Sequence, residues 1–171
     1  YQNNIEKLEA SQLQDILIKY QKDFIIQGYI EQHEYFSRLN SSSVNTMRIM
    51  TYRSIKDDGI HVIQRIMKVG QKNYLTDNEW TGSNTIGIAK DGKLNTFAVN
   101  KFGVKTEIIN EIRLADIPPN PFVEKVDNAA LEIASNFFYS RLLGIDFAVN
   151  KTGEVVFLEV NHAYNGINYF Q

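Results

Sequence analysis

The 171-residue sequence has no cysteine, only three prolines and no long apolar run. The lack of cysteine excludes disulfides, thiolate nucleophiles and zinc–thiolate sites, and it fits a reducing compartment. Apolar runs such as residues 24–26 and 155–158 are far shorter than the roughly 20 residues that a membrane-spanning helix needs. We therefore expect a cytoplasmic protein without membrane insertion.

An excess of positive charge is also lacking. The chain has 18 Lys and Arg residues against 20 Asp and Glu residues, a formal net charge of −2. Proteins that bind nucleic acid usually carry a concentrated basic patch, so we expect no nucleic-acid partner. The content of 43% hydrophobic and 22% charged residues is that of an ordinary globular domain.

Hydrophobic periodicity predicts helices and strands in an order typical of an α+β domain. We expect a helix over residues 5–20, a buried strand over 24–30 running into a connector, and a short helix over 33–39. Two hairpins follow, 44–55 with 60–69 and 85–89 with 94–99, and their turns carry Asp58-Gly59 and Asp91-Gly92. A long helix is predicted from Asn120 or Pro121 to Leu142. Its inward residues would be Val126, Ala129, Ala130, Ile133, Phe137 and Leu142.

The last predicted hairpin joins residues 144–150 to residues 155–161. A two-residue turn at Thr152-Gly153 would place Asp146 directly opposite Glu159, with Asn161 on the same face. Facing carboxylates repel, so this pattern favours a hard divalent cation such as Mg²⁺ between them, and without metal the two groups should raise each other's pKa. The alternative is a longer loop or a bulge, with both acids pointing into solvent. The other face of the hairpin is predicted to be purely apolar, with Ile145, Phe147, Val149, Val156, Leu158 and Val160.

Several motifs resemble those of the sugar-transfer-associated ATP-grasp family, which is seen in bacterial loci for cell-surface polysaccharides. They are Gly144-Ile145-Asp146-Phe147, Phe157-Leu158-Glu159-Val160-Asn161, the segment of residues 39–51 that contains Asn45-Thr46-Met47-Arg48, and Asp77-Asn78. The resemblance covers residues 24–171. It implies one portion of an ATP-grasp domain over 1–171, namely the metal-binding large lobe, an antiparallel sheet packed against helices. Residues 1–23 would lead in from the N-terminal lobe of the same protein, since the sequence starts without Met.

The resemblance also implies roles for individual residues. Asp146, Glu159 and Asn161 would bind Mg²⁺. The hinge Gln27, Gly28, Tyr29 and Ile30 would read the adenine edge of ATP, and Glu34 would reach the ribose. Arg48, oriented by Asn45, would act in catalysis on phosphate or an acyl-phosphate. For Arg65, Lys68, Asp77 and Asn78, the sequence is equally compatible with a functional role and with a purely structural one.

The function expected from this resemblance is an ATP-dependent carboxylate–amine or carboxylate–thiol ligase that works through an acyl-phosphate. Its small-molecule substrates would be a carboxylate and an amine or a sugar-derived compound. A phosphotransferase on the same scaffold and a non-catalytic nucleotide-binding module are the alternatives. A homodimer is compatible with the sequence.

Overall fold

The computed structural model describes residues 9–22, 28–71 and 82–163, and it contains two compact units, Tyr1–Ile30 and Glu31–Gln171. In the first unit, helix α1 (Ala10–Tyr20) follows a capping box formed by Glu9 and Gln12, and this confirms the described part of the predicted helix. Residues 28–30 have no regular structure, so the described end of the predicted strand is an irregular connector.

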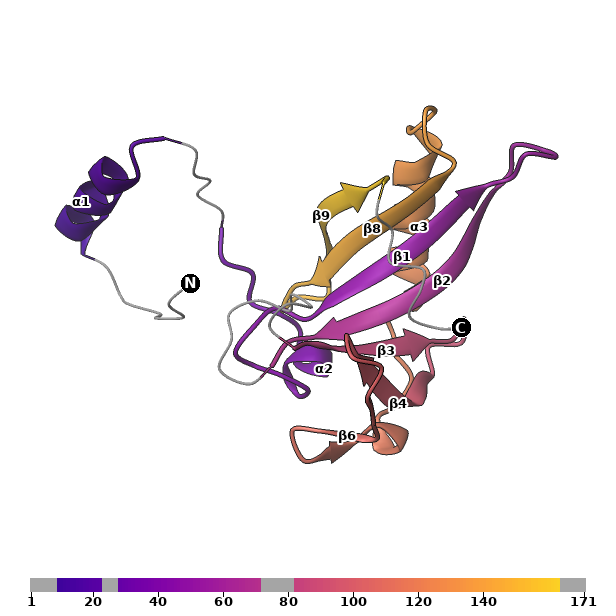
Figure 1. Cartoon of the computed structure of the whole chain (residues 1–171), viewed down its shortest axis with the longest axis horizontal. Helices are drawn as coiled ribbons and strands as arrows, with labels where there is room; N and C mark the ends of the chain where they lie inside the picture. Colours follow the sequence, from indigo (N-terminus) through magenta and orange to yellow (C-terminus); the bar gives the residue numbers. More distant parts are fainter. Residues whose placement is uncertain (1–8, 23–27, 72–81, 164–171) are drawn as a thin grey trace. The chain divides into compact units, whose positions relative to one another are not determined.

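The second unit is built on a seven-stranded antiparallel sheet with the strand order β5-β4-β3-β2-β1-β8-β9 (Figure 1). The two predicted central hairpins are confirmed within about two residues at their ends. The strands are β1 (Thr46–Arg53), β2 (Ile60–Val69), β3 (Asn84–Ile88), β4 (Leu94–Asn100), β5 (Lys105–Thr106), β8 (Leu142–Val149) and β9 (Val155–Asn161). Before the prolines at positions 118, 119 and 121, where no element was predicted, the chain also forms β6 (Ile108–Ile109), β7 (Ile112–Arg113) and the 3-10 turn η2 (Leu114–Asp116).

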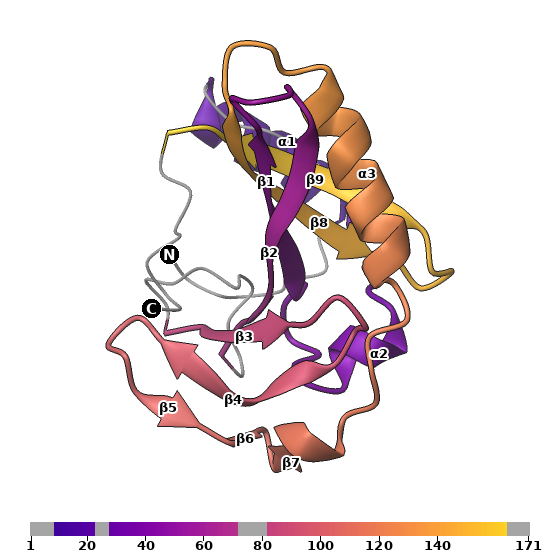
Figure 2. The ribbon, with the colours of Figure 1, turned by 90° about the vertical axis from the view of Figure 1, so that its right-hand side faces the viewer.

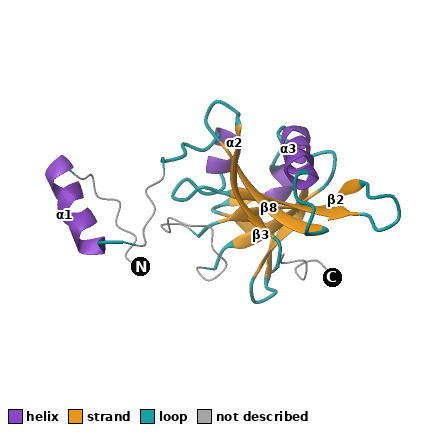
Figure 3. Cartoon of the chain, turned by 90° about the horizontal axis from the view of Figure 1, so that it is seen from above, coloured by secondary structure: helices purple, strands orange, loops and turns teal. Residues whose placement is uncertain are grey.

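Helices α2 (Glu34–Ser37) and α3 (Val123–Ser135) lie on the same side of this sheet (Figure 3), and α3 runs along β1, β2, β8 and β9 (Figure 2). The hydrophobic core lies between these two helices and the sheet. Burying each large side chain in it contributes roughly 1.5–3 kcal/mol. Its fully buried members include Phe36, Leu39, Met47, Ile49, Met67, Val126, Ala130, Ile145 and Phe147. Because side chains alternate along a strand, Arg48, Lys68 and Asp146 face the other side of the sheet.

The predicted long helix is wrong at its C-terminal end, since α3 ends at Ser135 and Leu142 begins β8. The side chain of Arg53 caps this end of the helix. The Arg53 guanidinium donates from Nη2 to the carbonyl oxygens of Ala134, at 3.0 Å, and Ser135, at 3.4 Å. Such contacts satisfy carbonyl groups that have no partner inside a helix and also favour the helix dipole. Of the predicted inward residues, those up to Phe137 do contact the core.

Among the described residues, no helix has both the length and the apolar composition needed to cross a membrane.

Candidate functional site

A row of charged side chains crosses three neighbouring strands on the face of the sheet opposite α3. Arg48 in β1 is the pairing partner of Asp146 in β8, and Asp146 is the partner of Glu159 in β9. The Arg48 guanidinium donates from Nε to Asp146 Oδ1 and from Nη2 to Oδ2, each at 2.7 Å. Its Nη2 also lies 3.6 Å from Glu159 Oε1. Arg48 therefore contacts both carboxylates of the predicted pair.

Lys68 in β2 adds a second positive charge to this row. Its Nζ donates to Asp146 Oδ2 at 3.1 Å, and its pairing partners on the adjacent strands are Thr46 and Thr85. The side chains of Arg48, Lys68 and Asp146 are only 10%, 12% and 7% exposed, whereas that of Glu159 is 60% exposed. The four side chains, hereafter the charge cluster, carry two positive and two negative charges.

The charge cluster controls the ionisation of Asp146. Burial by itself would raise the pKa of this carboxyl, because removal from water disfavours the charged form. The hydrogen bond and charge of Arg48, together with the charge of Lys68, outweigh burial and hold the pKa of Asp146 below its ordinary value. The expectation that repulsion from Glu159 raises this pKa is therefore wrong, because Arg48 and Lys68 both contact Asp146.

The pairing of Asp146 with Glu159 is as predicted, but the hairpin achieves it in another way. The loop has three residues, closed by the Asn150 amide donating to the Glu154 carbonyl oxygen at 3.0 Å, so Val149 faces Val155 rather than Val156. The ladder then shifts by one residue between Phe147 and Asp146, with Leu158 as the extra residue of a β-bulge. The longer loop and the bulge cancel, and Glu159 is placed opposite Asp146.

Because of the bulge, the prediction of a purely apolar face on this hairpin is wrong for part of β9. Val155 and Val160 pack against the core, whereas Val156 pairs with Ala148 and Leu158 is 38% exposed. Phe157 faces Phe147, with the ring centroids 6.3 Å apart. Without the extra residue, Leu158 would face Asp146 and Glu159 would point toward the core. The bulge is thus required for the charge cluster.

The predicted metal ligands offer oxygen donors that suit Mg²⁺. Asp146 and Glu159 are adjacent, and Asn161 Nδ2 donates to Glu159 Oε1 at 3.0 Å. Two carboxylates and an amide carbonyl form a hard donor set, which is the chemistry that Mg²⁺ prefers. Within residues 9–22, 28–71 and 82–163, no three His, Cys, Asp or Glu side chains form a metal-binding group. The set fits Mg²⁺ in chemistry, but both oxygens of Asp146 already accept hydrogen bonds.

Asn45 contacts a loop network. Its Nδ2 donates to Gln32 Oε1 and to the carbonyl oxygens of Phe36 and Asn40, and its Oδ1 accepts from the Gly70 amide. The residue is 1% exposed. These contacts give Asn45 a structural part in holding the chain that enters β1, and a role in orienting Arg48 stays a prediction.

The predicted adenine hinge belongs to the first compact unit. Gln27 lies outside the described residues, Gly28 and Ile30 are irregular, and Tyr29 is 84% exposed. In the second unit, Glu34 is exposed at the first turn of α2. Contacts of the hinge and of Glu34 with nucleotide stay predictions. Asp77 and Asn78 also lie outside the described residues.

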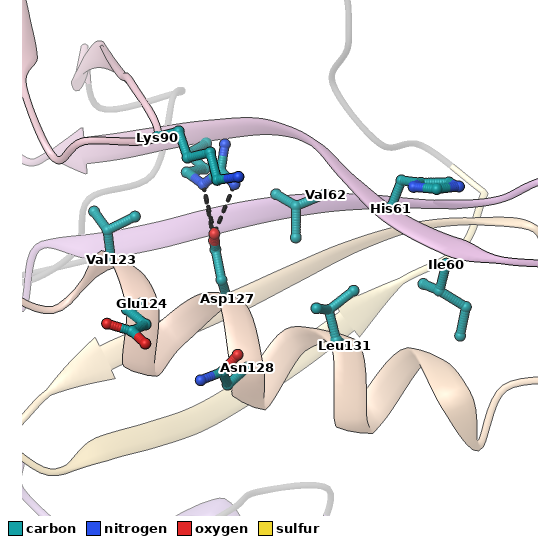
Figure 4. A pocket seen from close by; sticks show the side chains of 10 residues that line it. Ile60, His61, Val62, Lys90, Val123, Glu124, Asp127, Asn128 and Leu131 are labelled. Atoms are coloured by element: carbon teal, nitrogen blue, oxygen red, sulfur yellow. Dashed lines mark hydrogen bonds and ion pairs between the residues drawn. The ribbon is translucent and has the colours of Figure 1, made fainter.

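Arg65 and Lys68 were equal candidates in the sequence, and the structure separates them. Arg65 lies on the core face, where its Nη2 contacts Asp127 Oδ2 of α3 at 2.6 Å. This pair borders a hollow of about 600 Å³ between β2 and α3, with Val62 and Leu131 among its apolar walls (Figure 4). Lys68 instead joins the charge cluster on the opposite face. Lys68 lies on this face because Ile66, and not Arg65, pairs with Arg48, and this register cannot be read from the sequence.

A family model described as sugar-transfer associated ATP-grasp matches residues 6–171 of the chain. Searches of curated proteins and of solved structures found no match. The family match and the seven-stranded antiparallel sheet with its few helices confirm the predicted α+β fold of an ATP-grasp lobe.

Proposed function

Because the chain belongs to the sugar-transfer associated ATP-grasp family, we propose that the charge cluster is the Mg²⁺- and phosphate-binding part of an ATP-dependent ligase. The observation that carries this proposal is the row Arg48, Asp146 and Glu159, with Lys68 beside it. A buried aspartate held by two cations, next to an exposed glutamate, combines groups for phosphate with groups for a divalent ion.

The acidic and the basic residues of the charge cluster have different proposed roles. Asp146, Glu159 and Asn161 would hold Mg²⁺ through oxygen atoms, and bound Mg²⁺ would neutralise phosphate charge while the terminal phosphoryl group moves. Arg48 would stabilise by its positive charge the negative charge that develops on the transferred group, while its Nε and Nη2 stay on Asp146. Its low exposure strengthens this interaction, since water screens a buried charge less.

The proposed reaction has two steps. An oxygen of the substrate carboxylate attacks the terminal phosphorus of ATP, the bond from that phosphorus to the bridging oxygen breaks, and ADP leaves with the electron pair. An amine or thiol then attacks the carbonyl carbon of the acyl-phosphate, loses its proton, and displaces inorganic phosphate. A substrate from sugar metabolism would agree with the family description, and surface-polysaccharide metabolism is the setting that we propose for it.

The first test compares Mg·ATP binding by the whole protein and its Glu159→Gln variant in calorimetry. Gln keeps the shape of the side chain but removes one charge from the proposed metal site. We expect the affinity for Mg·ATP to fall about 100-fold or more, whereas binding of ATP without Mg²⁺ should change little. Glu132→Gln, on the exposed surface of α3, is the matched control and should bind like the parent.

Unchanged Mg·ATP affinity in Glu159→Gln would contradict the assignment of the metal site. ADP release then identifies the reaction. Release that requires both a carboxylate and an amine or thiol supports the ligase, and release with a single acceptor supports a phosphotransferase. Binding of Mg·ATP without any turnover would indicate a nucleotide-binding module.

A further inference from the structure

Both carboxylate oxygens of Asp146 accept hydrogen bonds from the two cations of the charge cluster. Oδ1 accepts from Arg48 Nε, and Oδ2 accepts from both Arg48 Nη2 and Lys68 Nζ. A divalent cation that contacts Asp146 would be close to two positive side chains that are both nearly buried. Positive charges at such short separations repel strongly when little water lies between them. Metal binding and the present contacts of Asp146 therefore compete.

The two cations are not held equally. Arg48 makes two hydrogen bonds of 2.7 Å through a planar fork, a geometry that fixes both partners. Lys68 makes one contact with Asp146, of 3.1 Å, through a flexible four-carbon stem. Lys68 is thus the cation that can leave Asp146 at the smaller cost.

We propose that Lys68 exchanges between two anions: it neutralises Asp146 in the nucleotide-free protein, and it moves to a phosphate oxygen of ATP when Mg²⁺ takes Asp146 Oδ2. This inference rests on the proposed function and adds a mechanism that couples the two ligands. Bound nucleotide attracts Lys68 away from Asp146, which frees that carboxylate for the metal. Bound metal repels Lys68 from Asp146, which favours its contact with the nucleotide. Mg²⁺ and ATP should therefore each increase the other's affinity at this site.

The Lys68→Met variant tests the exchange, because Met keeps much of the length of the side chain and removes its charge. In the whole protein we would titrate Mg²⁺ alone, ATP alone with a chelator present, and Mg²⁺ at saturating ATP. The variant should bind Mg²⁺ alone about tenfold more tightly, because Asp146 has lost one competing cation. It should bind ATP alone about tenfold more weakly, so the coupling between the two ligands should decrease.

Lys93→Met is the matched control. Lys93 also contacts one aspartate, with its Nζ 3.4 Å from Asp91 Oδ2, but its side chain is 72% exposed on the turn between β3 and β4. This variant should leave all three titrations unchanged. Thermal unfolding should confirm that both variants fold, and Arg48 still neutralises Asp146 when Lys68 is replaced.

The outcomes separate this inference from the proposed function. If Lys68→Met binds Mg²⁺ alone as weakly as the parent or more weakly, Lys68 does not compete with the metal and the exchange is wrong, while Mg·ATP binding by the parent still supports the proposed function. A parent that does not bind Mg·ATP contradicts both. If Lys68→Met does not fold, the Cε–Hε signal of Lys68 in the parent, assigned with Lys68→Arg, should shift on addition of Mg·ATP, and an unchanged signal would overturn the exchange.

Discussion

At the scale of the residue, Arg48 and Asp146 form a buried pair that neither can leave without cost. A buried charge that loses its partner stays in a poorly solvated position, and breaking such pairs typically costs 3–5 kcal/mol. Both side chains are at most 10% exposed. The pair should therefore matter for stability as well as for binding.

We predict that Arg48→Ala lowers the free energy of unfolding by about 3 kcal/mol, the low end of this range, because Lys68 still contacts Asp146. Asp146→Asn should destabilise as well, and the double variant should lose less than the sum of the two. Urea unfolding of the four proteins measures this coupling. As a control, Lys151→Ala breaks the exposed pair with Glu31 and should leave the urea midpoint nearly unchanged. Additive losses in the cycle would show that Arg48 and Asp146 do not stabilise each other.

At the scale of the element, each of the two hairpins that flank the site contains one extra residue. In β1 and β2 the ladder shifts between Met50 and Thr51, with Ile63 as the additional residue. Counting outward from the Asp58-Gly59 turn would have placed Arg65 opposite Arg48. The shift instead puts Ile66 there, which brings Lys68 to the charge cluster and sends Arg65 to Asp127. A bulge reverses which face every later side chain occupies.

These shifts explain what the sequence could and could not predict. Alternation and turn residues were sufficient for both central hairpins. Family motifs selected Arg48, Asp146 and Glu159, whose side chains the structure brings together, and their roles stay predictions. Bulges leave no clear pattern in a single sequence, so the contact between Lys68 and Asp146 could not be predicted. The end of α3 was missed for a similar reason, because the cation that closes it, Arg53, lies far away in the sequence.

The turn between β3 and β4 supports the chain that enters α3. Gly92 has φ +86°, and its carbonyl oxygen accepts from the Asn120 amide at 2.8 Å. A Cβ atom at this position would lie 2.6 Å from the Asn120 carbonyl oxygen, which is a backbone atom that cannot move aside easily. Gly103 has a similar φ of +77°, but no atom of the described residues lies within 4 Å of such a Cβ.

We predict that Gly103→Ala costs about 1–2 kcal/mol through backbone strain alone, and that Gly92→Ala costs at least about 1 kcal/mol more. The difference arises from the clash with Asn120. Urea midpoints of the two variants, with unchanged m-values, would measure it. Equal losses would mean that the segment before α3 moves freely with the turn.

At the scale of the whole molecule, one buried tyrosine sets a limit on stability at alkaline pH. Tyr35 is 3% exposed, and its hydroxyl donates to the Pro118 carbonyl oxygen at 2.8 Å, which joins α2 to the chain before α3. Burial raises the pKa of Tyr35 to about 12, with a small opposing effect from Arg38. In the unfolded chain this hydroxyl ionises near about pH 10. Its contribution to stability is therefore complete below about pH 10 and is lost as the pH rises toward 12.

We predict that the free energy of unfolding decreases by roughly 2–3 kcal/mol between about pH 10 and pH 12 because of this group. Tyr35→Phe should remove this part of the slope and cost about 1 kcal/mol at neutral pH, since one hydrogen bond is lost. Urea unfolding of both proteins at several pH values above about 9 tests the effect. A variant with the same alkaline slope as the parent would show that Tyr35 ionises as easily in the folded state as in the unfolded chain.

The bulge at Leu158 has another consequence, which concerns solubility. In the described part of the chain β9 is the last strand of the sheet, and Phe157 on it is 50% exposed. A regular apolar edge strand is a template on which other chains can add strands and aggregate. A bulge interrupts the even spacing of amide and carbonyl groups that an incoming strand would need. The extra residue that places Glu159 beside Asp146 should therefore also protect this edge from self-association.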